Sequence, residues 1–316
     1  MRDMVLRRLA LGVLTLLLVS VVVFVATELL PGNAAYAVLG QSATPARVKA
    51  LEEQLHLNRP AAVQYWLWIS GLLRGNPGTS LANGQAISNL VSGRIVNSAV
   101  LVVCAGILGT VLALGLGILA AARRDSWLDN TLSVTSLAVT ALPEFVVAIA
   151  LIIVFSTNLL HLFPAVSTIP PGQPAWQDPS SLVLPVATLV IVILPYMFRM
   201  MRGATVEALE SDYVEMAKLK GVRRGRILMR HALPNAIAPT IQVVGLNILY
   251  LAGGIVVVEY MFNYPGIGQA LVMAVSDRDI PMIQFIVLVL AAFYVFVNIV
   301  SDVIALWATP RRRFPR

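Results

Sequence analysis

A polar segment between residues 212 and 235 interrupts the apolar sequence and reads DYVEMAKLKGVRRGRILMRHALPN. Its pattern predicts two helical pieces separated by Gly221, because glycine readily takes the left-handed conformation that ends a helix. Ala217 and Gly221 are four residues apart, so they share one helix face. A face of small residues lets another protein approach closely, which favours docking over catalysis. The alternative is a solvated basic loop without a partner.

A second candidate is Glu144, which follows Pro143 inside an apolar run. An acid at the bilayer centre costs about 3 kcal/mol on insertion scales. Proline removes a backbone hydrogen bond and kinks a helix, so Pro195 predicts a similar bend in another run. Two interpretations of Glu144 stay open. It lines the bundle interior or a translocation path, or it is hydrogen-bonded at the kink of its own helix.

The motifs that mark catalytic, phosphate-binding and metal-binding sites do not occur in the sequence. Without G-x-x-x-x-G-K-[ST], the chain cannot hold ATP phosphates in a P-loop. C-x-x-C, H-E-x-x-H and G-x-S-x-G are also missing. The three histidines are scattered, and the single cysteine, Cys104, excludes an internal disulfide. We therefore expect a chain that is not an enzyme and holds no metal or cofactor.

The elements that position these residues are membrane helices. Of the 316 residues, 58% are hydrophobic and 12% charged, against roughly 25% charged in soluble domains, and the mean hydropathy is +0.81. A spanning helix needs about 20 mostly apolar residues, and its backbone must be satisfied internally. We therefore predict an all-α membrane protein with six transmembrane helices: Leu9–Leu30, Ala99–Ala122, Thr131–Thr157, Leu182–Met201, Ala236–Phe262 and Met282–Ala308.

The lysine and arginine residues predict the orientation of these helices. With both termini cytoplasmic, 17 of the 23 basic residues lie on the cytoplasmic side, as the positive-inside rule requires. The net charge of +7 is then a topology signal and does not indicate a nucleic-acid partner. The cytoplasmic set is Arg2, Arg7, Arg8, Arg123, Arg124, Arg199, Arg202, Lys218, Lys220, Arg223, Arg224, Arg226, Arg230, Arg311, Arg312, Arg313 and Arg316.

Residues 1–30 are predicted to be a basic start followed by a retained first helix. A cleaved signal peptide is the alternative, but its apolar region is about 7–15 residues long, and this run has 22. Residues 31–97 form a long extracytoplasmic loop with two helical pieces, Thr44–Leu55 and Ala61–Leu73. The second piece carries Tyr65, Trp66 and Trp68, aromatic residues typical of the membrane–water boundary. This loop either caps the bundle or serves docking and substrate handling.

Three further features concern packing. Glu28 and Glu259 are predicted near the outer membrane boundary, where a charge costs little. Asp302, near the inner end of the last helix, is predicted to form a packing pair with Asn298 or to be the partner of a nearby arginine. Small residues favour close helix packing, and we expect this at Gly253, Gly254, Gly106, Gly109, Gly115 and Gly117.

The polar segment resembles the EAA motif of ABC importer permeases. In that family a Glu-Ala-Ala pattern is followed by a glycine and later by Leu-Pro. The matching residues here, with Arg224 in the charged surround, are Glu215, Ala217, Gly221, Leu233 and Pro234. Met216 replaces the first alanine. The resemblance implies that residues 204–235 contain a cytoplasmic coupling helix, between the fourth and fifth spans, that docks on an ATPase subunit.

The remainder of the chain resembles the B-type permeases of the dipeptide, oligopeptide and nickel branch. The segments that carry this resemblance are LNRPAAVQYWLWISGLLRGNPGTS, VEYMFNYPGIGQ, RDIPMIQ and NIVSDVIALWATPRRR. Asn33 and Thr309 depart from it, since an aspartate is usual at each. The resemblance covers nearly the whole chain and makes residues 98–316 a five-helix permease core.

This resemblance implies a permease subunit of an ATP-driven importer in the inner or plasma membrane. It would move short peptides by alternating access. Its expected partners are a second, homologous permease, two ATPase subunits or a fused ATPase, and an extracytoplasmic substrate-binding protein. ATP and Mg would be bound by the ATPases. Nickel, glutathione or haem are alternative cargoes. An ion-coupled secondary transporter is a less favoured class, because no internal repeat is found.

Overall fold

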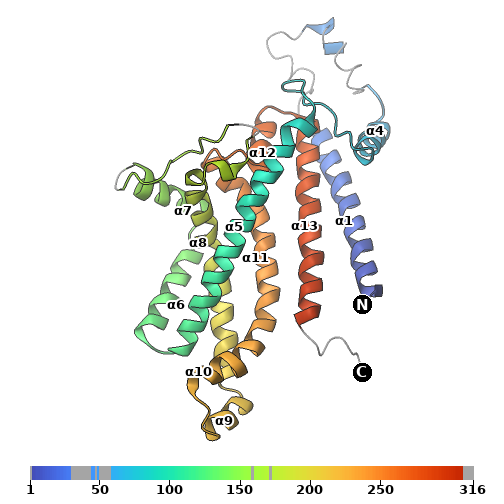
Figure 1. Ribbon diagram of the computed structural model, residues 1–316. Helices are drawn as coiled ribbons and strands as arrows, with labels where there is room; N and C mark the ends of the chain where they lie inside the picture. The colour runs from blue at the N-terminus through green and yellow to red at the C-terminus, as the bar shows by residue number, and fades with distance from the viewer. Residues whose placement is uncertain are drawn as a thin grey trace.

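The computed structural model describes residues 2–29, 44–46, 48, 49, 58–157, 160–170 and 173–308. The described chain is helical apart from turns and one isolated β-bridge between Thr79 and Ala86 (Figure 1). Its α-helices are α1 (Arg2–Glu28), α4 (Ala61–Leu73), α5 (Ile87–Ala122), α6 (Trp127–Thr140), α7 (Glu144–Ile152), α8 (Ser180–Leu209), α9 (Asp212–Leu219), α10 (Arg224–Ile227), α11 (Leu233–Met261), α12 (Ile267–Ser276) and α13 (Ile280–Ala308). Short π-helical turns cover Ile153–Thr157 and Leu228–Ala232.

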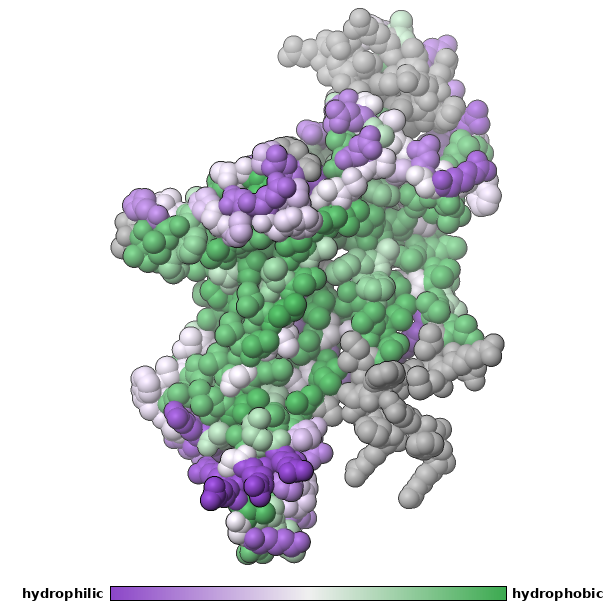
Figure 2. All heavy atoms as spheres, viewed as in Figure 1, coloured by the Kyte–Doolittle hydropathy of each residue, from purple (hydrophilic) through white to green (hydrophobic). Residues whose placement is uncertain are grey.

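Among the described residues, four to six segments are long and apolar enough to cross a membrane. Four are single helices, within α1, α5, α8 and α13. Two more are bent pairs: α6 with Glu144–Thr157 at 107°, and Arg224–Ile237 with Thr240–Leu251 at 54°. Figure 2 shows a hydrophobic band between two hydrophilic ends. The all-α membrane architecture is thus confirmed.

The predicted third span, Thr131–Thr157, is not one kinked helix. The chain leaves the helical conformation at Pro143, whose ψ is 149°, and α7 starts at Glu144 in a new direction. Proline lacks the N–H needed to continue α6 and disfavours helical geometry in the residue before it. In contrast, α8 continues through both Pro185 and Pro195. Fourteen residues of α6 span about 21 Å, less than the hydrocarbon core of about 30 Å.

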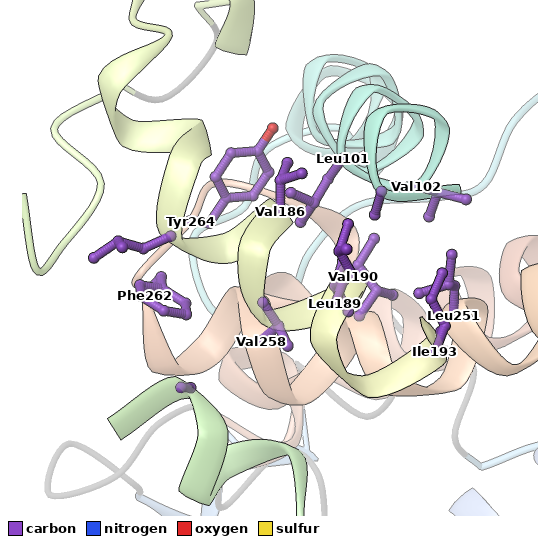
Figure 3. Close-up of a cluster of buried hydrophobic side chains, with 14 of the residues drawn as sticks. Leu101, Val102, Val186, Leu189, Val190, Ile193, Leu251, Val258, Phe262 and Tyr264 are labelled. Carbon is purple, nitrogen blue, oxygen red and sulfur yellow. The ribbon is translucent and has the colours of Figure 1, made fainter. Parts of the chain in front are cut away.

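The core is built around α8, which packs against α5, α11, α6 and α7. Figure 3 shows its inner face, with Leu189 and Ile193 between Leu101 of α5 and Leu251 of α11. Two of the glycines predicted to allow close helix packing, Gly109 and Gly117 of α5, permit this approach of α5 to α8. A Cβ on Gly109 would lie 2.6 Å from Ile193 Cδ1, and one on Gly117 would lie 2.8 Å from Met201 Cβ.

Helix α1 lies at the edge of the bundle, against α13 (Figure 1). Arg8 forms an ion pair with Asp302 at 2.9 Å, which confirms the expected arginine partner. At the other end Gln284 donates to Thr27 at 2.7 Å. The predicted helix Ala61–Leu73 is confirmed as α4, and its Tyr65 bonds to Ser20 of α1 at 2.8 Å. The predicted helical piece Thr44–Leu55 falls mostly outside the described residues.

At the end of the bundle opposite α9 and α10, Glu259 differs from the prediction that a charge there costs little. Its side chain is fully buried. It accepts hydrogen bonds from Ser98 Oγ at 2.5 Å and from the backbone N–H groups of Gly268 at 2.7 Å and Gln269 at 3.3 Å. A carboxylate at a helix N-terminus satisfies N–H groups that lack partners within the helix. Glu259 therefore fixes α12 to α11 and α5.

The close approach at Glu259 depends on the Pro-Gly-Ile-Gly turn. A Cβ on Gly266 would lie 2.1 Å from the Glu259 carboxylate. Next to it, the hydroxyl of Tyr264 donates to the Asn97 carbonyl at 2.9 Å. Burial, and secondly the charge of Glu259, raises the pKa of Tyr264 above its ordinary value. The phenol therefore remains a neutral donor at physiological pH.

Candidate functional site

The polar segment forms a compact projection beyond one end of the bundle, built from α9 and α10 (Figure 1). Gly221 has φ +71°, the left-handed conformation expected of it. The N–H of Gly221 donates to Lys218 O at 2.9 Å, and that of Val222 donates to Ala217 O at 3.1 Å. These two bonds form a Schellman motif, which closes the C-terminus of α9. A Cβ at Gly221 would meet no atom within 4 Å, so the backbone alone requires glycine here.

Ala217 does not belong to the outer face of this projection. It is 6% exposed and packs in a small core with Val214 and Ile227, flanked by Leu209 and Val222. Its small side chain lets α9 lie directly against the following turn. The prediction that Ala217 and Gly221 form an exposed small-residue docking face is therefore wrong for Ala217, because α10 folds back over it.

The exposed side of α9 carries three apolar side chains among charged ones. Tyr213, Met216 and Leu219 are 44%, 54% and 77% exposed, and they recur every third residue. We call these three residues the coupling foot. Sequence reasoning missed them, although apolar side chains at helical spacing in a basic, polar helix were a usable signal. Exposed apolar groups that project from a protein end mark an interaction site.

The other predicted residues of this segment have separate positions. Glu215 is exposed on α9. Arg224 is exposed and donates to the Ala122 carbonyl at the end of α5, at 3.2 Å. Leu233 and Pro234 start α11, where Leu233 packs on the buried cluster around Met201. The projection is thus attached to α5 and α11.

Glu144 lies far from this segment in the fold, at the start of α7. Its carboxylate faces α11, where a Cβ on Gly254 would lie 2.8 Å from Glu144 Oε1. Tyr250, one turn away on α11, lies close enough to interact electrostatically with the same carboxylate. Glu144 is half-buried, and Tyr250 is 55% exposed. Glu144 thus sits at the break between α6 and α7 and faces α11, and the two interpretations of its role stay open.

Metal chemistry finds no geometric support in the described part of the chain. No group of three or more histidine, cysteine or acidic residues lies close enough there to hold an ion. What the geometry offers is a compact projection with exposed apolar side chains among charged ones, and an acid that faces a neighbouring helix.

Comparison with known proteins defines the class to which this arrangement belongs. Residues 113–314 match the family described as binding-protein-dependent transport system inner membrane component, and residues 1–103 match its N-terminal counterpart. The chain therefore belongs to the family of inner membrane components of binding-protein-dependent transport systems. It is a multi-pass inner membrane protein and the permease component of an ABC transport system, in which ATP is used by partner ATPases.

Relatives align over almost the full chain. The sequence is 33% identical over 311 residues to the probable peptide ABC transporter permease protein y4tP of Sinorhizobium fredii, covering 98% of this chain and 99% of that one. It is 34% identical over 317 residues to the glutathione transport system permease protein GsiC of Salmonella typhimurium, covering 99% and 100%. A putative peptide transport system permease protein of Brucella abortus, BAB2_1050, is 32% identical over 314 residues, covering 99% and 100%.

Proposed function

We propose that this chain is one of two homologous permease subunits of an importer for short peptides. Six spans with cytoplasmic termini would enclose the path together with the second permease. Two ATPase subunits or a fused ATPase would dock at the cytoplasmic side. A binding protein would deliver cargo to the outer side, which the predicted extracytoplasmic loop, residues 31–97, would face. The peptide cargo is supported by the names of two relatives, and glutathione, itself a short peptide, by the third.

The coupling foot is the observation that carries this proposal. An apolar tip of Tyr213, Met216 and Leu219, exposed in the isolated chain, suits burial in a cleft of a partner protein. The coupling foot is part of α9, and only two residues, Glu210 and Ser211, separate α9 from α8. ATP-driven closure of the ATPase pair would move the foot, and the bundle would alternate between outward and inward openings. ATP hydrolysis would reset it.

Purification of the chain from native membranes in mild detergent tests the composition of the complex. We expect mass spectrometry to find a related permease, one or two ATPases and an extracytoplasmic binding protein. A chain recovered alone or as a homodimer, without ATPase, would contradict the proposal. Transport into proteoliposomes, with di- and oligopeptides and glutathione in competition, then distinguishes the cargoes.

We place the cargo path beside Glu144. On α11 an exposed stripe of Tyr250, Val257 and Tyr260 runs next to this acid. Aromatic hydroxyls and a carboxylate could bind peptide N–H and amino groups, whereas lipid-facing surfaces disfavour such groups. The second permease subunit would close this face from the other side.

Two adjacent glycines of α11 test that placement. Gly254→Ala should displace the Glu144 carboxylate, since its Cβ would lie 2.8 Å from an oxygen, and should reduce peptide transport. Gly253→Ala is the matched control, because a Cβ there meets no atom within 4 Å and helix propensity changes equally. Initial uptake rates in proteoliposomes are the measurement. Equal rates for both variants would remove Glu144 from the path.

A further inference from the structure

Helix α6 is attached to the bundle mainly by polar contacts, with Leu132 packed at the edge of the apolar core. Its only buried side chains are Asp129 and Ser136. Arg202 of α8 binds Asp129 through two parallel contacts, Nε to Oδ1 at 2.5 Å and Nη2 to Oδ2 at 2.6 Å. Ser136 donates to the Pro195 carbonyl at 3.3 Å. The apolar side chains of α6 point largely outward, with Val134 66% and Leu137 57% exposed.

These contacts specify the position of α6 along α8. Asp129 and Ser136 are seven residues apart and lie on one face, and Thr140 continues that face, 3.5 Å from Arg199 Nη2. Within a bilayer, burial of apolar surface does not drive one helix onto another, so polar contacts and close packing decide the arrangement. A two-pronged Arg–carboxylate bond is also directional. Asp129 and Arg202 therefore determine the register of α6.

The turn between α5 and α6, residues 123–126, is connected to the projection of α9 and α10. Arg224 of α10 donates to the Ala122 carbonyl just before this turn. Arg124 in the turn forms an ion pair with Glu210, which directly follows α8. At its far end α6 leads into the bend at Pro143, where Glu144 lies against α11. One helix thus connects the cytoplasmic projection to the acid on the proposed path.

We propose that Asp129 and Arg202 are positioning residues that make α6 move together with α8. A displacement of the coupling foot is then transmitted through α8 and α6 to the position of Glu144. The tie between α6 and α8 is independent of the transport proposal, whereas its use in coupling rests on it. Neither residue touches cargo or ATP in this scheme. The pair acts by holding the α6–α7 bend at a fixed place on α11.

Asp129→Asn tests the pair, with Asp125→Asn as matched control. Asp125 is an exposed acid of the same turn, 3.6 Å from Arg124. In reconstituted complexes we expect Asp129→Asn to retain bound ATPases and ATP hydrolysis but to transport about fivefold less peptide per ATP or worse. Arg202→Lys keeps the cation and loses the two-pronged bond, so it should be intermediate. Unchanged transport per ATP in Asp129→Asn, equal to that of Asp125→Asn, would overturn the coupling role.

A distance measurement tests the tie itself. Spin labels at Leu137→Cys on α6 and Glu207→Cys on α8, both exposed positions, are introduced in a Cys104→Ala background. For the unaltered pair we expect one narrow distribution of distances between the two labels, the same with ATP and with an ADP–vanadate trap. In Asp129→Asn this distribution should broaden. Should that variant not fold, Arg202→Lys should show the broadening. A distribution that stays narrow in both would overturn the tie. Absence of ATPases from the wild-type preparation would instead contradict the proposed function alone.

Discussion

Replacing Met216 and Leu219 together by aspartate is expected to weaken binding of the ATPase subunits by about 100-fold or more. Full burial of one such side chain contributes about 1.5–3 kcal/mol, and each 1.4 kcal/mol is a factor of ten in affinity. Burying a carboxylate in an apolar cleft adds a further penalty. The permease in nanodiscs and purified ATPase subunits allow the dissociation constant to be measured directly.

The matched control exchanges the same two residues for each other's type, Met216→Leu with Leu219→Met. It keeps the apolar area of the coupling foot and should bind as the unaltered chain does. Both positions are exposed, at 54% and 77%, so neither variant should disturb folding of the bundle. Wild-type affinity in the aspartate variant would show that the ATPases dock elsewhere.

Glu259→Ala is expected to destabilise the end of the bundle that holds α12 by about 3 kcal/mol or more. It removes the acceptor of the Ser98 hydroxyl and of two backbone N–H groups. A buried donor without a partner costs about 1–3 kcal/mol. Because these donors come from α5 and α12, both helices should loosen. The measurement is the thermal unfolding midpoint of the purified chain in detergent, with yield as a second readout.

Two variants make this result interpretable. Glu259→Gln keeps one acceptor oxygen and should lose less stability than Glu259→Ala. Glu28→Ala removes an exposed acid at the end of α1 and should leave the midpoint close to that of the unaltered chain. If Glu259→Ala and Glu28→Ala unfold at the same temperature, the buried carboxylate does not anchor α12.

Several features of this protein could be predicted from the sequence because their causes are local. Apolar runs of sufficient length become membrane helices whatever they contact, since the bilayer itself selects them. The left-handed residue Gly221 follows from backbone sterics at one position. The helix Ala61–Leu73 begins directly after Pro60, and its boundaries were predicted as the structure has them.

Other features depend on which elements meet, and these required the tertiary structure. Ala217 faces inward because α10 folds back onto α9, and no spacing within α9 determines that. Glu259 is buried because Ser98, 161 residues away, and the α12 N-terminus converge on it. Pro143 ends its helix while Pro195 does not, although both follow apolar residues.

The pairing of Asp129 with Arg202 is the clearest case of this kind. Each residue alone is an ordinary charge near one end of an apolar run. Only the packing of α6 on α8 brings Asp129 and Arg202 together and removes both oxygens of the Asp129 carboxylate from solvent. Local patterns thus determine which segments are helical, because backbone and solvent act at each residue. Burial, partners and mechanical linkage are decided by tertiary packing, because they depend on residues distant in the chain.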